Sequence, residues 1–169
     1  MTVLAARDIR RLINNTPPLI EGYINLDEQV QANGFEMTIR DIATHRTAGK
    51  IAASNSRRVL SELEPLSFDG TGSIELAPGC YMITYNEIVH IPKNLMALGR
   101  PRSSLLRCGV NVGLAVWDAG YEGRSQSLLV VYNQHGFTLQ KNARVAQLVF
   151  FELTGETEGY KGIYQGENI

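Results

Sequence analysis

After the Pro17-Pro18 pair, the sequence consists of a succession of short apolar segments divided by Gly, Pro, Asn and Asp. Short apolar segments between turn-forming residues are typical of antiparallel β-structure. Their number and spacing predict a sandwich, a jelly roll or a small barrel. The expected strands cover residues 34–39, 73–76, 81–85, 88–91, 95–98, 128–132, 137–139 and 145–153.

A helix and an arm flank these segments. Apolar residues such as Ile9 and Ile13 recur at helical spacing and predict a helix over residues 3–13, which the two prolines end. Residues 154–169 are polar and glycine-rich, so we expect a flexible C-terminal arm. A length of 169 residues is enough for one hydrophobic core, and we expect a single domain over residues 1–169.

The charges are balanced overall but unevenly distributed. The formal net charge is −1, unlike the strongly basic surface of most proteins that bind nucleic acids. Residues 88–151 nevertheless contain seven Lys or Arg and only two acids, Asp118 and Glu122. A basic segment with isolated carboxylates suits a small polyanionic ligand, although a chance distribution of charge would look the same.

The sequence gives no sign of a membrane or secreted protein. No apolar segment approaches the roughly 20 residues of a membrane-spanning helix, and the first residues lack the apolar stretch and cleavage site of a secretory signal. Two cysteines without a closely spaced pair, Cys80 and Cys108, are typical of reduced thiols. We therefore expect a cytoplasmic protein that binds neither membranes nor nucleic acids.

Residues 100–107 concentrate three arginines and two serines without a nearby acid. Guanidinium groups bind phosphate oxygens through paired donors, and serine hydroxyls add further donors. Arg102, Ser103, Ser104 and Arg107 are therefore candidates for a triphosphate cradle. A solvated surface loop of the same composition is the simpler alternative.

Residues 116–123 combine an apolar run with a glycine-flanked turn that contains Asp118 and Tyr121. Near bound phosphates, a carboxylate can orient and deprotonate a water molecule for attack on phosphorus. Tyr121 offers a flat apolar face to a sugar or a base. The structural alternatives are an aspartate that satisfies backbone donors in the turn and a tyrosine that belongs to the core.

Residues 144–150 form an apolar segment with one amide side chain, Gln147, which needs a polar partner such as a phosphate or a neighbouring loop. Other nucleotide and metal motifs are missing from the sequence: it contains no G-x-x-x-x-G-K-[ST] loop and no G-x-G-x-x-G after a strand. His45, His90 and His135 are far apart and near no cysteine pair, so we expect no zinc site.

Together, P-R-S-S-L-x-R at residues 101–107, D-A-G-Y-x-G at 118–123 and R-V-A-Q-L-V-F at 144–150 resemble the motifs of the trimeric dUTP diphosphatase and dCTP deaminase superfamily. Residues 6–13 resemble the N-terminal helix of its deaminase branch. The resemblance implies a mostly β, distorted jelly roll or barrel with a short N-terminal helix. It also implies a homotrimer with active sites between subunits, and Mg²⁺ bound to the substrate triphosphate rather than to a protein cage.

According to the same resemblance, position 128 separates the two activities of the superfamily. In its bifunctional deaminase–diphosphatase members, a glutamate that moves protons at the pyrimidine ring lies ten residues after the hairpin aspartate. Here this position is Leu128, which neither accepts nor donates a proton. We therefore expect hydrolysis of dUTP to dUMP and pyrophosphate, with a dCTP deaminase and a non-catalytic nucleotide-binding regulator as alternatives.

The superfamily pattern also implies a role for individual residues. It assigns to Asp118 the activation of water for attack on the α-phosphorus, and it has an aspartate where this chain has the longer Glu36. The other implied contacts are Arg102, Ser103, Ser104 and Gln147 to phosphates, Arg107 to a phosphate or a neighbouring subunit, Asn111 and Gly113 to uracil, Tyr121 to deoxyribose, and Tyr160, Lys161 and Gln165 from the arm.

Overall fold

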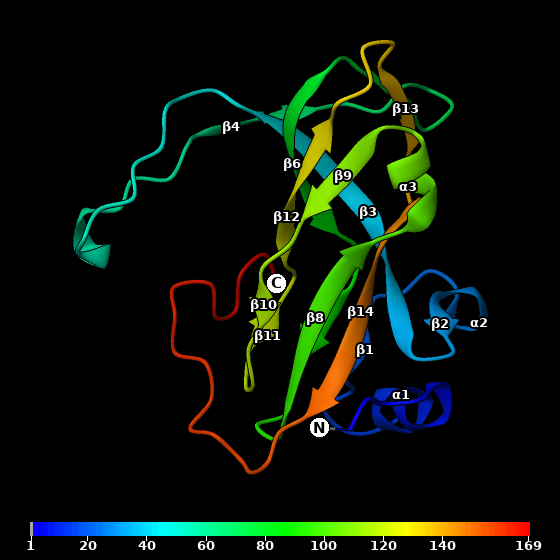
Figure 1. The fold of residues 1–169 in the computed structure, drawn as a ribbon, viewed down its shortest axis with the longest axis vertical. Coiled ribbons are helices and arrows are strands. Elements are labelled where there is room, and N and C mark those ends of the chain that lie inside the picture. Colours follow the sequence, from blue (N-terminus) through cyan, green and yellow to red (C-terminus); the bar gives the residue numbers. More distant parts are fainter. Residues whose placement is uncertain (1) are drawn as a thin grey trace.

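The structure, a computed structural model that describes residues 2–169, is built mainly from antiparallel strands (Figure 1). Its largest sheet contains β3 (Gly34–His45), β6 (Gly79–Tyr85), β8 (Leu95–Pro101), β9 (Val110–Gly113), β10 (Val116–Trp117), β12 (Gln126–Val131) and β14 (Arg144–Glu152). These strands follow one another in the order β10, β8, β14, β3, β6, β12 and β9. All pairings along this path are antiparallel, as the apolar segments predict.

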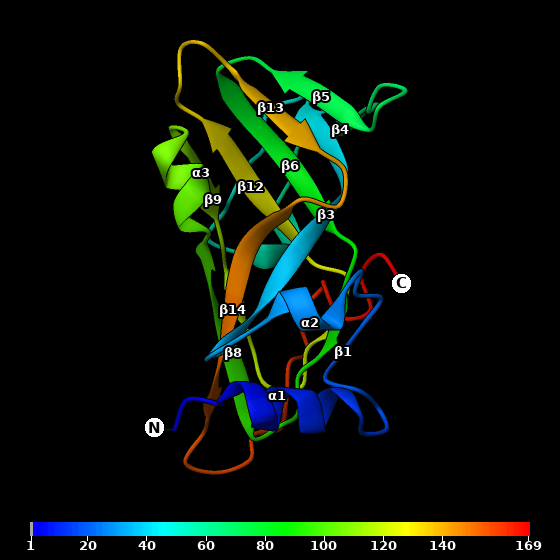
Figure 2. The same ribbon diagram turned by 90° about the vertical axis from the view of Figure 1, so that its right-hand side faces the viewer.

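Strand β3 makes the sheet curl because its two halves pair with different partners. The first half pairs with β14, and the second half pairs with β6 and with β4 (Leu63–Leu66). The register against β6 shifts between Ile39 and Asp41, and such an irregularity bends a strand. Figure 2 shows β3 passing from β14 toward β6 along the length of the molecule.

The inner face of the curled sheet carries the core. Phe35, Met37, Ile83, Leu129 and Phe150 have no exposed surface, and burying an apolar side chain of this size contributes about 1.5–3 kcal/mol to folding. Along β6 and β12, buried residues alternate with partly exposed ones, so every second side chain points away from the core. These outward side chains are available to a ligand.

Shorter elements complete the fold. A three-stranded sheet joins β1 (Ile20–Glu21), β7 (Ile88–His90) and β11 (Glu122–Gly123), a second small sheet pairs β5 (Ser73–Leu76) with β13 (Phe137–Gln140), and β2 (Val30–Gln31) extends the start of β3. The helices are α1 (Ala6–Ile13), α2 (Leu26–Gln29), the single 3₁₀ turn η1 (Asn55–Arg57) and α3 (Ser103–Arg107). Pairing with β7 holds β11, and with it the turn that follows β10.

The predicted N-terminal helix is present but begins later than residue 3. Val3 forms a β-bridge with Phe151, and the backbone N–H of Leu4 donates to the carbonyl of Phe150 at 3.0 Å. This pairing with β14 keeps the first residues extended, and α1 begins at Ala6. Within the helix, Ile9 and Ile13 are buried against the core, as their spacing predicts.

Each of the eight predicted apolar segments forms or overlaps a strand. The largest difference is in β3, which continues through Arg40 and Asp41 to His45, although the apolar pattern predicts an end at Ile39. Residues 40–45 therefore continue the strand. Pairing with β6 and β4 extends β3 across this polar stretch, because ladder hydrogen bonds do not require apolar side chains.

The segment between β3 and β4, residues 46–62, projects from the sheet as a long excursion (Figure 1). A backbone bridge between Lys50 and Val59 ties its two sides together. Among its apolar side chains, Ile51, Val59 and Leu60 are exposed. Within residues 2–169, no helix has both the length and the apolar character required to span a membrane.

Candidate active site

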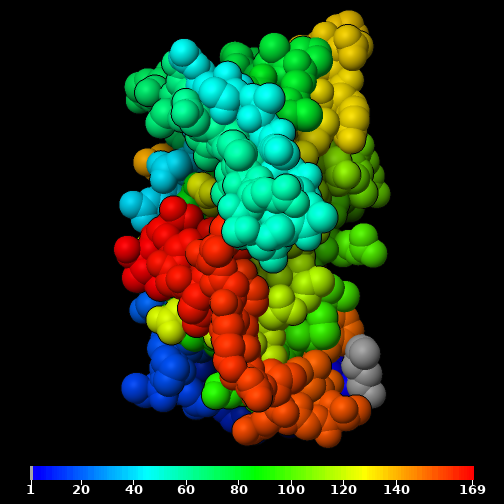
Figure 3. All heavy atoms as spheres, turned by 90° about the vertical axis from the view of Figure 1, so that its left-hand side faces the viewer, coloured from blue at the N-terminus to red at the C-terminus, as the bar shows by residue number. Residues whose placement is uncertain are grey.

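A cavity of about 740 Å³ lies between the outward face of the sheet, the excursion and the C-terminal arm, residues 154–169. Figure 3 shows the excursion in teal and the arm in orange to red, side by side on one face of the molecule. They also touch, because the guanidinium carbon of Arg58 lies 6.0 Å from the ring centre of Tyr164, within cation–π range. Two segments distant in sequence therefore cover the same cavity.

Leu128, on β12, lines the cavity. It is opposite Met82 on β6 and opposite Gly113 on β9, and all three residues line the cavity. The excursion adds Ile51 and Leu60, which makes this part of the wall apolar. At the position that the superfamily resemblance associates with proton transfer, the cavity thus presents a hydrocarbon side chain.

Asp118 lies at the rim of the cavity, immediately after β10. The turn closes through a hydrogen bond from the N–H of Tyr121 to the Asp118 carbonyl at 3.1 Å. Gly120 has a φ of +79°, and a Cβ there would lie 2.7 Å from the Cα of Gly159 in the arm, so this position requires glycine. The Asp118 side chain is exposed, and no hydrogen bond from elsewhere in residues 2–169 engages its carboxylate. It does not serve as the cap of its own turn.

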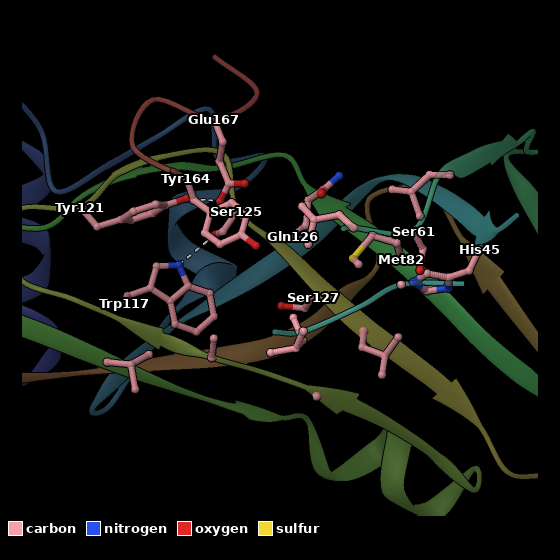
Figure 4. A pocket seen from close by; sticks show the side chains of 18 of the residues that line it. His45, Ser61, Met82, Trp117, Tyr121, Ser125, Gln126, Ser127, Tyr164 and Glu167 are labelled. Atoms are coloured by element: carbon pink, nitrogen blue, oxygen red, sulfur yellow. Dashed lines mark hydrogen bonds between the residues drawn. The ribbon is translucent and has the colours of Figure 1, made fainter. Parts of the chain in front are cut away.

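Trp117 and Ser125 hold the wall beside Asp118. Both residues are buried, and the indole Nε1–H donates to the Ser125 hydroxyl at 2.9 Å (Figure 4). This contact joins the end of β10 to the residue that precedes β12. It therefore fixes the backbone on both sides of the turn that carries Asp118.

Tyr121 is buried, and its ring forms a further part of the wall. The ring packs edge to face against Tyr160, with ring centres 5.6 Å apart, and the phenol O–H donates to Oε1 of Glu167 at 2.7 Å. Burial first and the contact with Glu167 second raise the pKa of Tyr121, so the phenol keeps its proton. Burial also raises the pKa of Glu167, and the hydrogen bond from Tyr121 opposes that effect.

The arm reaches the cavity through backbone contacts with the Asp118 turn. The N–H of Tyr160 donates to the carbonyl of Ala119 at 2.7 Å. The side-chain amide of Gln165 also bonds to the backbone of this turn: it donates to the Gly120 carbonyl at 3.1 Å and accepts from the Glu122 N–H at 3.2 Å. The composition predicts a flexible arm, but these hydrogen bonds attach residues 160 and 165 to the Asp118 turn. The ammonium of the exposed Lys161 pairs with Glu158, at 2.5 Å.

The arginine–serine segment lies elsewhere, at the start of α3. Arg102, Ser104 and Arg144 line a separate cavity of about 390 Å³, whereas none of the four candidates Arg102, Ser103, Ser104 and Arg107 lines the larger cavity. Arg102 donates from Nε to Oε1 of the buried Glu36 at 2.6 Å. In Figure 1, α3 lies at the upper right beside β9, whereas β10 and β11 lie lower and to the left. Within one copy, the cationic segment and Asp118 are thus apart.

The remaining candidates are also separate from the larger cavity, except Gly113 and Tyr160, which line it. Arg107 donates to the hydroxyl of Ser103 at 3.3 Å. The amide oxygen of Asn111, on β9, accepts from the N–H of Val112 at 2.9 Å. Gln147, on β14, lies opposite Glu36 and Arg100 and packs against Gly34, where a Cβ would come within 2.5 Å of its Nε2.

The cavity also contains residues that the sequence motifs do not include. Ser125, Lys50 and Glu167 lie in polar stretches with no periodic or motif signal, and only contacts made in three dimensions bring them to the cavity. In the part of the chain that the structure describes, no cluster of three or more His, Cys, Asp or Glu side chains has the arrangement of a metal site.

Its curled antiparallel sheet places this chain among the β-proteins of jelly-roll type. More particularly, it belongs to the dCTP deaminase-like family, whose model matches residues 3–153. It is 49% identical to a protein of Methanosarcina mazei named probable deoxyuridine 5'-triphosphate nucleotidohydrolase, over 99% of both chains. A protein of Archaeoglobus fulgidus with the same name is 47% identical, over 100% of this chain and 99% of its own.

The fold is similar to the crystal structure of 2'-deoxycytidine 5'-triphosphate deaminase from Agrobacterium tumefaciens, with a TM-score of 0.68 and 19% identity. The match covers 88% of this chain and 47% of that one, so this chain spans about half the length of that deaminase. These comparisons confirm the resemblance to the superfamily and the predicted jelly-roll-like fold.

Proposed function

We propose that this chain is a dUTP diphosphatase, which hydrolyses dUTP to dUMP and pyrophosphate. The observation that carries the proposal is that Asp118 and Leu128 line the same cavity. Asp118 provides an exposed carboxylate, and Leu128 provides an apolar side chain. The first suits the activation of water, and the second provides no group for proton transfer to a pyrimidine ring. The names of full-length relatives that are 47–49% identical support the same activity.

In the proposed reaction, Asp118 accepts a proton from a water molecule as that water attacks the α-phosphorus. The new bond joins the water oxygen to the α-phosphorus, and the bond from that phosphorus to the bridging oxygen of the β-phosphate breaks, so pyrophosphate leaves. A positioned general base of this kind contributes about 10²–10⁴-fold to the rate. The exposure of Asp118 at the cavity rim supports this role, because substrate and water can both reach it.

For the nucleoside, we propose that uracil contacts β9 and that the deoxyribose packs on Tyr121. Gly113 leaves the backbone of β9 accessible beside Leu128, and Asn111 lies two residues earlier on the same strand. The buried ring of Tyr121 suits an apolar sugar face that lacks a 2'-hydroxyl.

For the phosphates, we propose a homotrimer in which a neighbouring copy supplies the cationic segment. In one copy α3 is apart from Asp118, so a site with both needs a second chain. The residues proposed to contact phosphates are Arg102, Ser103, Ser104, Gln147 and, at a phosphate or subunit contact, Arg107. From the arm, Tyr160, Lys161 and Gln165 are proposed to lie close to the bound nucleotide.

Mg²⁺ is the proposed cofactor, bound to the triphosphate of the substrate. The donor set fits this arrangement, because the described residues that line the cavity include only two carboxylates, Asp118 and the Glu167 that Tyr121 engages, rather than a cluster of ligands. Mg²⁺ is commonly held by one or two carboxylates together with substrate phosphates. Bound there, the ion neutralises phosphate charge. The protein residues then have to hold the nucleotide and orient the water.

We also propose that residues 1–169 act as one domain with residues 154–169 as its arm, and that the protein works in the cytoplasm. Cys80 and Cys108 are both free and exposed, which suits a reducing compartment.

The test incubates the purified protein with dUTP or dCTP and MgCl₂, and measures pyrophosphate, ammonia and the monophosphate product. We expect dUMP and pyrophosphate from dUTP, and no ammonia from dCTP. Release of ammonia from dCTP would show that Leu128 does not prevent deamination. Binding of dUTP without pyrophosphate release would instead identify a nucleotide-binding regulator.

A further inference from the structure

We infer that Glu167 is a positioning residue, which holds the ring of Tyr121 in the cavity wall and thereby increases the preference for deoxyribose over ribose. The inference rests on the proposed function, because it assigns a sugar contact to Tyr121. Its structural basis is the hydrogen bond between these two side chains, which come from segments 46 residues apart.

The Tyr121 ring is held from two sides. The phenol O–H donates to Oε1 of Glu167 at 2.7 Å, and Tyr160 packs edge to face on the ring. Figure 4 shows Tyr121 and Glu167 pointing toward one another at the cavity. A ring with 6% of its surface exposed and its hydroxyl engaged cannot tilt without losing this hydrogen bond.

Backbone hydrogen bonds hold Glu167 at this position. Its carbonyl accepts from the N–H of Arg124 at 2.9 Å, and it forms a parallel bridge with Gly123. The next residue, Asn168, exchanges two hydrogen bonds with Arg124, one of 3.1 Å from Nε of the arginine and one of 3.0 Å from its own Nδ2. The end of the arm is thus paired with β11, and the carboxylate has little freedom to move.

Gly123 leaves the room that this contact needs. A Cβ at this position would lie 2.6 Å from the phenol oxygen of Tyr121 and 3.2 Å from Cγ of Glu167. Any other residue would push the two side chains apart. The local sequence is therefore compatible with the contact only because position 123 is glycine.

The contact needs an acceptor at position 167 but not a charge. Either a carboxylate or an amide oxygen accepts from a phenol. Without an acceptor, the buried hydroxyl loses its partner, and the ring is free to move and open space for a 2'-hydroxyl. Loss of one such hydrogen bond corresponds to about a tenfold change in binding.

The test compares Glu167→Ala, Glu167→Gln and Glu156→Ala, the last being a control at an exposed glutamate of the same arm. We measure kcat and KM for dUTP and for UTP with MgCl₂. Glu167→Ala is expected to raise KM for dUTP and to reduce the dUTP preference by about tenfold, with kcat nearly unchanged. Glu167→Gln and Glu156→Ala are expected to behave like the wild type.

A double-mutant cycle separates this role from general support of the arm. In a Tyr121→Phe protein, which lacks the hydroxyl, addition of Glu167→Ala should cause no further loss of preference for dUTP. An unchanged preference in Glu167→Ala, or a further loss in the double variant, would overturn the inference.

Failure of the proposed function would be recognised separately, as a wild-type protein that releases no pyrophosphate from dUTP. In that case hydrogen exchange still tests the contact, at the amides of Arg124 and Gly166, which bond to Glu167 and Glu122. Faster exchange in Glu167→Ala than in Glu156→Ala would support the contact, and equal exchange would overturn it.

Discussion

The Nε atom of Arg102 lies 2.6 Å from Oε1 of Glu36, and Oε2 of the same carboxylate lies 3.2 Å from Nη1 of Arg144. The glutamate side chain is 8% exposed and those of both arginines are 30% exposed, so one nearly buried carboxylate neutralises and orients two partly exposed cations. Glu36 stands where the superfamily has an aspartate. Its extra methylene reaches from β3 to the arginine that precedes α3.

Replacement of Glu36 by Gln should destabilise the protein. The amide keeps the shape but removes the carboxylate that pairs with Arg102 and leaves Arg144 with only the more distant Glu28, at 3.8 Å, so we expect the free energy of unfolding to fall by about 2–3 kcal/mol. Denaturant unfolding of the wild type and the variant measures this change in the free energy of unfolding. The control is Glu64→Gln, whose 2.8 Å pair with Arg46 is exposed and should contribute less than about 1 kcal/mol. Equal losses in the two variants would contradict this prediction.

Asp118→Asn should abolish most turnover without abolishing binding. The amide retains the size of the side chain but cannot accept a proton from water, so kcat for dUTP should fall by at least about 10². Pyrophosphate release and equilibrium binding of dUTP measure the two effects. Glu122→Gln is the matched control, because Glu122 is the other acid of the same basic stretch and its carboxylate faces His90 at 3.3 Å. Near-normal turnover in Asp118→Asn would remove Asp118 from the proposed role.

Ser125→Ala should weaken the wall of the cavity. It leaves the buried indole N–H of Trp117 without its 2.9 Å acceptor, and such a loss costs about 1–3 kcal/mol. Because Trp117 is the only tryptophan, its fluorescence reports unfolding directly. Ser127→Ala serves as the comparison, since the buried Ser127 hydroxyl has no hydrogen-bond partner in residues 2–169. Similar destabilisation in both variants would argue against the importance of the indole contact.

Glu87 should make stability depend on pH. It is fully buried and accepts from Nε2 of Gln29 at 2.6 Å and from Oγ1 of Thr38 at 2.5 Å. Burial raises its pKa above the ordinary value, despite these hydrogen bonds. The neutral carboxyl is therefore favoured in the folded protein, and its stabilising contribution is present at low pH and is lost as pH rises through the raised pKa.

The Glu87→Gln variant, which cannot ionise, isolates this contribution. Relative to the variant, the free energy of unfolding of the wild type should decrease as pH rises above the ordinary glutamate pKa of 4.5 and through the raised pKa of Glu87. Denaturant unfolding of both proteins at several pH values measures the difference. A constant difference across this range would contradict the prediction.

The apolar pattern predicts the long strands well because each of these strands contains several buried apolar residues close together in the sequence. The missed strands are short: β1, β2, β10 and β11 contain two residues each, too few for a recognisable period, and β4 and β9 contain four each. The pattern also ends β3 early at Arg40 and Asp41, whose strand conformation depends on partners in β6 and β4. Prediction therefore fails where pairing, rather than residue type, determines the backbone.

The chemical groups of this protein can be identified from its amino-acid order alone: the carboxylate of Asp118, the arginines and serines of residues 100–107, and a leucine at position 128. Which of these groups share a cavity depends on the folded chain. It brings Glu167 to Tyr121 and Glu36 to Arg102, and it separates α3 from Asp118. The physical reason is that motifs and periodicity are local properties of the chain, whereas contacts between distant segments follow from how the strands pair and pack.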